Sequence, residues 1–263
     1  MDKNKNDFFV GYSDQIPQNS KKGIRRFVVV SALVLVVTAV LFSFTQRPFT
    51  NATFELTKET TLIGTFYQKP YPMLSIKDSL STRSVMLLGF GKFGANKYID
   101  HLLEKNQSLN GQQLEIKGNL IYYNNKTLLQ ITSQEKVQIL GPSNVKFTPE
   151  FSPNTATLEG EIVDPKCYFG VMKPGFGKIH RSCAVRCISG GIPAVFVNAD
   201  SLSPVPYYII TDSNGDALHA ALANYIGKAA IIKGRTVKLD DWNYIQLDVN
   251  NIELTGKPST IFE

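Results

Sequence analysis

The chain has 263 residues, enough for one large or two small domains, and its 43% hydrophobic and 19% charged residues are typical of a folded protein. The formal net charge of +6 is modest, and the sequence has no long run of like charges that could act as a nucleic-acid-binding tail. We therefore expect a folded protein whose charge alone does not indicate a nucleic-acid partner.

Residues 27–45 are predicted to form a transmembrane helix. The stretch from Phe27 to Phe44 (FVVVSALVLVVTAVLFSF) contains no charged residue, and about 20 apolar residues suffice to cross the hydrocarbon core of a membrane. A cleaved signal peptide is the alternative. However, the apolar run is longer than a typical h-region, and no A-x-A-like cleavage site follows it.

The charges beside this helix predict its orientation. Basic residues precede it at Lys21, Lys22, Arg25 and Arg26, whereas only Arg47 follows closely behind. Because basic flanks stay in the cytoplasm, residues 1–26 are predicted to be a cytoplasmic tail. We expect a single-pass protein of the inner (cytoplasmic) membrane whose C-terminal domains are periplasmic or extracellular.

The chain after the predicted membrane helix contains an internal repeat. Residues 111–131 (GQQLEIKGNLIYYNNKTLLQI) align without a gap with residues 227–247 (GKAAIIKGRTVKLDDWNYIQL). The matching positions include Gly111 and Gly227, Lys117-Gly118 and Lys233-Gly234, Asn124-Asn125 and Asp240-Asp241, and Gln130 and Gln246. Each copy places apolar strands around a polar two-residue turn, which is typical of β-hairpins.

Each copy is predicted to be a small Greek-key barrel of the OB type. Upstream of the hairpins, VMLLGFGKFGANKYIDHLL parallels YYIITDSNGDALHAALANYI, and both indicate a strand, a turn and a short amphipathic helix. One helix before the last hairpin suits an OB-type barrel, in which a helix closes one end. We predict a mainly β protein with barrels over residues 52–142 and 156–258, joined by a linker at 143–155. A single two-sheet β-sandwich is the alternative.

Two ligand-binding patterns have simpler explanations in this chain. Gly89 to Gly94 (GFGKFG) matches the dinucleotide pattern G-x-G-x-x-G, but hairpins follow it in place of a parallel βαβ unit, so we expect a structural strand-to-helix turn. Tyrosines and lysines such as Tyr71 and Lys69 could line a groove for single-stranded nucleic acid on an OB barrel. An exported domain would not meet nucleic acid, and we expect no such partner.

The stretch HRSCAVRC at residues 180–187 is the strongest functional signal. If residues 180–188 are helical and end at the Gly190-Gly191 stop, then His180, Cys183 and Cys187 lie on one face at i, i+3 and i+7. Cys167, predicted at the end of the strand GEIVDPKC, could supply a fourth ligand. These four residues form the predicted Cys3His metal site.

Several chemistries remain open for this cluster. Zinc is the expected metal, and copper(I) or an iron–sulfur centre would also accept the thiolates. A c-type haem is not expected, because the chain has no C-x-x-C-H. One alternative is a disulfide from Cys167 to Cys183 or Cys187. Another is a pair of redox-active thiols, although C-x3-C differs from the C-x-x-C of thioredoxin-like enzymes.

The stretch from Gly160 to Pro193 resembles a family of bacterial exported and membrane-anchored proteins with tandem OB-like domains. The shared pattern is Gly-Glu-hydrophobic-Val-Asp, Cys-Tyr, a Gly-rich loop, His-x-x-Cys-Ala-x-x-Cys and Gly-Gly-x-Pro. In this chain the pattern falls on Gly160 to Asp164, Cys167-Tyr168, His180, Cys183-Ala184, Cys187 and Gly190 to Pro193. The resemblance implies that the cysteines and the histidine act together, and that the protein accompanies respiratory or other redox membrane proteins.

We therefore expect a membrane-anchored binding or scaffold subunit of a larger, possibly respiratory, membrane complex. No nucleophile–base–acid set stands out in the sequence, so no enzyme activity is expected. An electron-transfer or metal-delivery protein and a thiol-redox enzyme are the alternatives.

Overall fold

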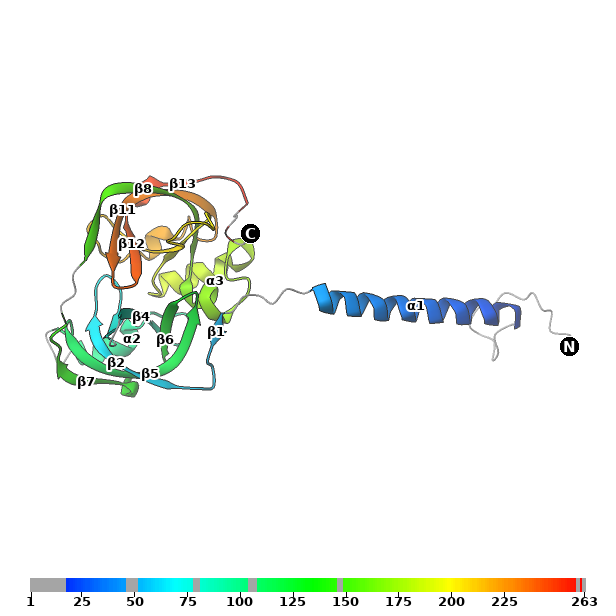
Figure 1. Ribbon diagram of the computed structural model, residues 1–263, viewed down its shortest axis with the longest axis horizontal. Coiled ribbons are helices and arrows are strands. Elements are labelled where there is room, and N and C mark those ends of the chain that lie inside the picture. Colours follow the sequence, from blue (N-terminus) through cyan, green and yellow to red (C-terminus); the bar gives the residue numbers. More distant parts are fainter. Residues whose placement is uncertain are drawn as a thin grey trace. The chain divides into compact units, whose positions relative to one another are not determined.

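The computed structural model describes residues 18–45, 52–77, 81–103, 108–145, 149–258 and 261. The chain divides into two compact units, Met1–Pro48 and Phe49–Glu263 (Figure 1). We call the second of them the β unit. Of the cytoplasmic tail predicted for residues 1–26, residues 1–17 lie outside the described residues.

The first unit contains helix α1 (Gln18–Thr45). Its 28 residues would extend about 42 Å at 1.5 Å per residue, more than the roughly 30 Å of a membrane core. The stretch Ser20–Thr45 has a mean hydropathy of 2.8 in its most apolar window. By length and composition this helix can span a membrane, a test that a signal sequence near the N-terminus also passes.

The first half of the β unit, barrel 1, is a closed five-stranded barrel. Its central strands follow the order β5–β2–β3–β4–β6, and β6 pairs back with β5. Only β4 and β6 are parallel, which is the strand arrangement of an OB barrel. The elements are β1 (Thr53–Phe54), β2 (Thr60–Tyr67), β3 (Met73–Lys77), β4 (Thr82–Gly89), α2 (Asn96–Leu103), β5 (Gln112–Tyr123), β6 (Lys126–Ile131), η1 (Gln134–Lys136) and β7 (Val137–Pro142).

The second half, barrel 2, repeats this arrangement as β11–β8–β9–β10–β12 with β12 closing on β11. The prediction of two tandem barrels is therefore confirmed, and the β-sandwich alternative is wrong. The elements are β8 (Glu150–Val163), η2 (Cys167–Val171), α3 (Gly177–Ser189), β9 (Val195–Asn198), β10 (Tyr207–Thr211), η3 (Ala220–Leu222), β11 (Ala229–Leu239), β12 (Trp242–Gln246), η4 (Val249–Asn251) and β13 (Ile252–Leu254). Strand β8 begins within the segment predicted as the linker, residues 143–155.

The amphipathic helix predicted in the second copy is wrong, because only the three-residue 3-10 turn η3 forms there. The Tyr71 hydroxyl of barrel 1 bonds both the amide and the carbonyl of Leu218, at 3.1 and 3.0 Å. Helix α3 supplies Ala184 and Ile188 to the core of barrel 2 instead.

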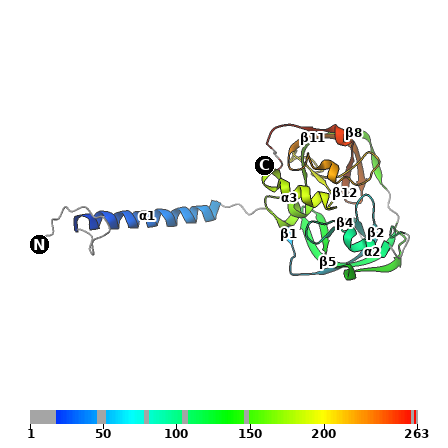
Figure 2. The same cartoon turned by 180° about the vertical axis from the view of Figure 1, so that it is seen from behind.

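The two barrels share one hydrophobic core. Tyr71, only 1% exposed, donates from its hydroxyl to Ile210 O at 2.8 Å and is therefore not available to stack on a nucleic-acid base. The barrels lie next to each other in both ribbon views (Figures 1 and 2). The shared cluster contains Tyr71, Met73, Met86, Leu88, Ile121 and Leu128 of barrel 1 and Val163, Phe169, Cys187, Ile192, Val195, Val197, Tyr207, Ile209, Val237, Leu239, Trp242 and Tyr244 of barrel 2.

The hairpin turns of the two barrels make reciprocal contacts. Asn124 Nδ2 in the β5–β6 turn donates to the Tyr207 hydroxyl at 3.1 Å, and Asp240 Oδ2 in the β11–β12 turn accepts from Ser84 Oγ at 2.6 Å. Asn124 and Asp240 are equivalent in the repeat. The register of β4 with β6 and of β10 with β12 makes Ser84 and Tyr207 equivalent as well. Each turn therefore contacts the start of the equivalent strand in the other barrel, β10 or β4.

The GFGKFG sequence is a strand-to-helix turn, as predicted. Its glycines allow the two barrels to approach closely, because Gly94 N donates to Gly190 O at 2.9 Å. A Cβ on Gly94 would lie 2.2 Å from Gly191 O, and one on Gly190 would lie 2.0 Å from Lys92 O. Neither position can carry a side chain without moving the backbone.

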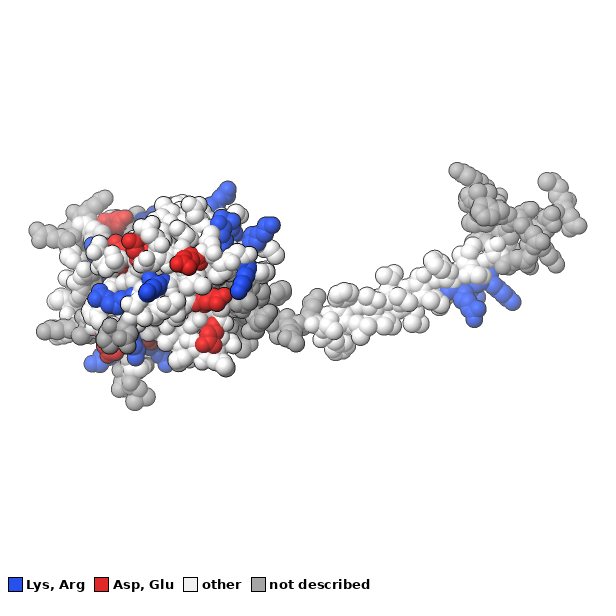
Figure 3. Space-filling view, turned by 90° about the horizontal axis from the view of Figure 1, so that it is seen from above, with Lys and Arg blue, Asp and Glu red and all other residues white. Residues whose placement is uncertain are grey.

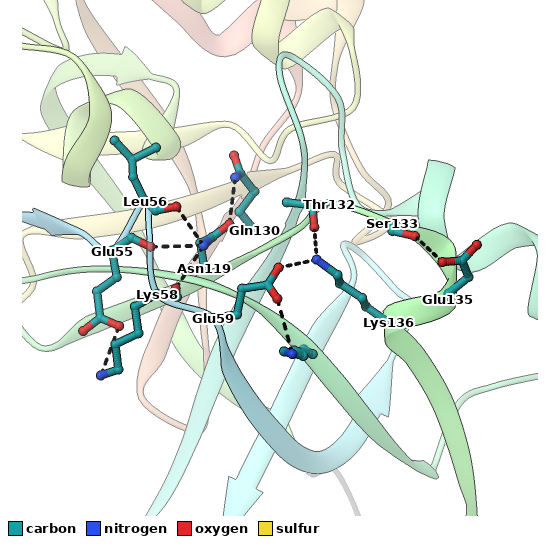
Figure 4. Close-up of polar contacts among 11 residues, drawn as sticks. Glu55, Leu56, Lys58, Glu59, Asn119, Gln130, Thr132, Ser133, Glu135 and Lys136 are labelled. Carbon is teal, nitrogen blue, oxygen red and sulfur yellow. Dashed lines mark hydrogen bonds and ion pairs between the residues drawn. The ribbon is translucent and has the colours of Figure 1, made fainter.

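Asn119 fixes the segment through which the chain enters barrel 1. Its Nδ2 lies within hydrogen-bond distance of the carbonyls of Glu55, Leu56 and Lys58 at 3.1, 3.3 and 3.0 Å (Figure 4). Gln130 Nε2 reaches Asn119 Oδ1 at 3.4 Å and orients the amide. The chain between β1 and β2 is therefore held firmly against the barrel.

Candidate metal centre

The predicted cysteine cluster lies in an insertion between β8 and β9 of barrel 2. Residues 164–194 connect these strands, whereas residues 68–72 suffice between the equivalent β2 and β3 of barrel 1. Figure 1 shows α3, the main element of this insertion, near the level where the two barrels meet. The site therefore lies beside the contact between the barrels.

Helix α3 arranges three of the predicted ligands as expected from the sequence. It spans Gly177–Ser189, so His180, Cys183 and Cys187 fall at i, i+3 and i+7. Gly190 ends the helix by donating its N–H to the carbonyls of Arg186 and Cys187, at 3.0 and 3.1 Å. The predicted helix and its glycine stop are confirmed.

Cys167 is positioned differently from the prediction. Strand β8 ends at Val163, and Cys167 opens the short π-helical turn η2. Phe169, two residues after Cys167, is fully buried and packs edge-to-face on Tyr207 with ring centroids 4.9 Å apart. The shared core therefore anchors the turn that presents Cys167 to α3.

The structure brings Cys167, His180 and Cys183 together. Their ligand atoms all lie within 4.8 Å of one another, so the three residues could hold a metal ion. Cys167 and His180 are 6% and 4% exposed, whereas Cys183 is partly exposed. The group is therefore closed on the protein side and reaches solvent through Cys183.

Cys187, the fourth predicted ligand, is not one of these three residues but adjoins two of them. Its thiolate accepts hydrogen bonds from Cys167 and Cys183, and the bond from Cys167 is the main cause that lowers the pKa of Cys187. The same hydrogen bond, with burial, raises the pKa of Cys167, while burial raises the pKa of Cys183. Cys187 therefore lies next to the three-residue group and interacts with two of its thiols.

Asp164, which was not among the predicted site residues, orients the site. It is fully buried; its Oδ2 lies 3.2 Å from His180 Nε2, and its Oδ1 accepts from Cys167 N at 3.2 Å. A carboxylate only accepts hydrogen bonds, so it favours the tautomer with a proton on Nε2. That tautomer leaves the Nδ1 lone pair of His180 for a metal.

Lysines from both barrels surround the thiols. Lys166, buried beside Cys167, donates from Nζ to Gly89 O and Gly91 O of barrel 1 at 2.9 and 2.8 Å. Burial lowers the pKa of Lys166, and the neighbouring Asp164, Cys187 and Cys167 oppose that shift. The positive charge of Lys92 in barrel 1 lowers the pKa of both Cys183 and Cys187, because it stabilises their thiolates.

The predicted disulfide is constrained by this geometry. All three cysteines are free thiols in the structure. Cys183 and Cys187 are four residues apart in α3, where Cβ atoms lie about 5–6 Å apart, whereas a disulfide needs about 3.5–4.5 Å. Cys167 has its sulfur within 4.8 Å of that of Cys183 and also interacts with the Cys187 thiol, so both predicted pairings of Cys167 remain open.

No family model, curated protein or solved structure matches this chain. The resemblance to exported bacterial proteins remains an expectation from the sequence pattern.

Proposed function

We propose that this protein is a membrane-anchored, exported metal-binding subunit whose zinc centre is formed by Cys167, His180, Cys183 and Cys187. The observation that carries the proposal is the convergence of ligand atoms from Cys167, His180 and Cys183 within 4.8 Å. Closure of Cys187 onto the same ion would complete a Cys3His set, which is a recognised closed zinc site.

The surroundings of the site support metal binding over chance proximity. The contact from Asp164 Oδ2 to His180 Nε2, at 3.2 Å, is the kind of carboxylate–histidine pairing that orients metal ligands. Three thiolates, one neutral imidazole and Zn²⁺ would carry a net charge of −1, and Lys166 and Lys92 supply opposite charge. The chain thus offers the ligands, their orientation and the compensating charge.

The burial of the site supports a structural or binding role over thiol catalysis. Reactive cysteines sit in partly exposed positions, whereas Cys187, the thiol with the lowered pKa, is only 2% exposed. A closed ligand set without an open position is typical of structural zinc. We therefore propose a binding or scaffold subunit of a larger membrane complex.

The anchor and its orientation complete the proposal. Helix α1 would remain as a single transmembrane span, with the basic residues Lys21 to Arg26 on the cytoplasmic side. The β unit would then lie in the periplasm or outside the cell. The resemblance to exported proteins that accompany redox membrane proteins supports a respiratory partner.

Metal content and thiol accessibility test this proposal. Residues 49–263 would be purified without oxygen or chelators, any tag removed, and analysed by inductively coupled plasma mass spectrometry. We expect one zinc per chain, with all three thiols reacting only after denaturation in the presence of a chelator. Absence of metal together with one free thiol would overturn zinc ligation in favour of a disulfide.

Matched variants localise the metal. His180→Gln is expected to lose zinc, whereas His101→Gln, which alters a histidine in α2, is expected to retain it. A coloured centre with a reducible absorption band would replace the structural role with electron transfer. Equal zinc content in both variants would show that the metal lies elsewhere.

A further inference from the structure

A basic groove opens where α3 begins. It has a volume of about 520 Å³ and runs between the start of α3, the start of β11 and the segment after β13. Four cationic side chains line it: Lys178, Arg181, Lys228 and Lys257. None of the described residues that line the groove is acidic.

The four cations have no acidic partner among the residues that the structure describes. Within the part of the chain that the structure describes, none of them forms an ion pair. Lys178 and Lys257 are exposed. Figure 3 shows Lys and Arg side chains gathered along one edge of the β unit. The groove therefore offers unpaired positive charge to an external anion.

Exposed apolar side chains accompany this charge. Ile179, next to Lys178 in the first turn of α3, is 84% exposed, and Leu254, which lines the groove, is 44% exposed. Basic residues with apolar neighbours are typical of surfaces that rest on a lipid headgroup layer. A site for a small soluble anion would not need an apolar side chain projecting beside it.

The chain also enters the β unit on this side. Strand β1 packs against η2, and a Cβ on Gly170 would lie 3.5 Å from Phe54 Cβ. In both ribbon views β1 and α3 lie on the same side of the β unit (Figures 1 and 2). Between α1 and β1 the chain has only residues 46–52. At about 3.4 Å per residue, this segment reaches at most roughly 25 Å.

We propose that the groove lined by Lys178, Arg181, Lys228 and Lys257 binds the headgroups of acidic phospholipids in the membrane that anchors the chain, with Ile179 inserted among them. The groove binds headgroups by itself, and the short tether adds to this affinity by raising their effective concentration at the groove. This inference requires α1 to be an anchor but is independent of any metal.

Vesicle binding tests the proposal. Residues 49–263 are suitable because they contain the whole described core, from Phe66 to Ile252. We expect them to co-sediment with vesicles of phosphatidylglycerol and phosphatidylcholine, but not with phosphatidylcholine alone. Since each basic residue near an acidic surface contributes about fivefold in affinity, Lys178→Gln with Lys257→Gln should weaken binding about 25-fold.

The control pair is Lys77→Gln with Lys233→Gln, which removes the same charge from two exposed lysines outside the groove. This pair should bind nearly as well as the unaltered protein. Ile179→Ser should weaken binding about tenfold, as expected when part of one apolar side chain is no longer buried. Circular dichroism would verify that every variant is folded.

Three results would overturn the proposal. They are equal binding to both kinds of vesicle, equal losses in the groove and control pairs, and displacement of the protein from vesicles by inorganic phosphate at low concentration. The last result would identify a site for a small soluble anion in place of a membrane surface.

Discussion

Replacing Asp164 by Asn tests whether the buried carboxylate prepares His180 to bind a metal. The two side chains have nearly the same volume, so the packing around this fully buried position is retained. The Asn oxygen can still accept from Cys167 N. The Asn amide would instead donate to His180 Nε2, which favours the tautomer with its proton on Nδ1 and removes the lone pair that a metal needs.

The size of the effect follows from the one contact that is changed. Loss of a hydrogen bond that orients a metal-binding histidine typically lowers metal affinity 10- to 100-fold, or about 1.4 to 2.7 kcal/mol in binding free energy. The contact here is the 3.2 Å pair between Asp164 Oδ2 and His180 Nε2. We therefore expect Asp164→Asn to bind zinc 10- to 100-fold more weakly.

Chelator competition under anaerobic, reducing conditions measures this affinity. Asp248→Asn is the matched control, because Asp248 caps η4 by accepting from Asn250 N at 2.9 Å, outside the ligand insertion. The control should bind zinc as the unaltered protein does. A folded Asp164→Asn variant with unchanged affinity would refute the role assigned to the carboxylate.

Three further predictions concern the fold. Barrel 1 alone, residues 49–145, should not unfold cooperatively. Its six side chains in the shared core would lose burial worth about 1.5–3 kcal/mol each, and the total is comparable with the whole stability of a domain. A cooperative thermal transition in that fragment would contradict this prediction. Trp242→Phe should lower the free energy of unfolding by about 1–3 kcal/mol, measured in urea, because the buried Ser84 O loses its 2.8 Å donor. Burial lowers the pKa of His219, so the unfolded chain binds a proton at this histidine more readily than the folded chain does. The free energy of unfolding should therefore be highest above about pH 6.5 and fall as the pH drops toward the folded-state pKa. Urea titrations across this range should show a smaller fall in His219→Gln than in the control His101→Gln, and equal falls would contradict the assignment.

Features encoded in short stretches of sequence were predictable. The apolar run predicted helix α1. The gap-free repeat predicted two barrels, because hairpin turns and alternating strands are local patterns. The spacing of His180, Cys183 and Cys187 gave the ligand face of α3 for the same reason. Each of these patterns depends on neighbours within about two helical turns or one hairpin.

Features that depend on contacts between the barrels were not predictable. Asp164 and Lys166 precede Cys167 in DPKC, but only the folded chain shows that one orients His180 and the other bonds Gly89 and Gly91. The contact of Tyr71 with the backbone of Leu218, 147 residues away, is of the same kind. The residue pattern of one repeat does not show which residues of the other repeat it contacts.

The reciprocal contacts of the hairpin turns also bear on why only one of the two barrels carries a site. In a twofold symmetric dimer both subunits present the same surface, so each contact occurs twice between equivalent residues, as it does here between the two barrels. In a true homodimer, an insertion between the first two strands would appear on both subunits. Joining the two barrels in one chain removes that constraint, so one barrel can carry the thiols while the other keeps a short loop and supplies Lys92 beside them. Fusion thus permits an asymmetric centre on a nearly symmetric frame.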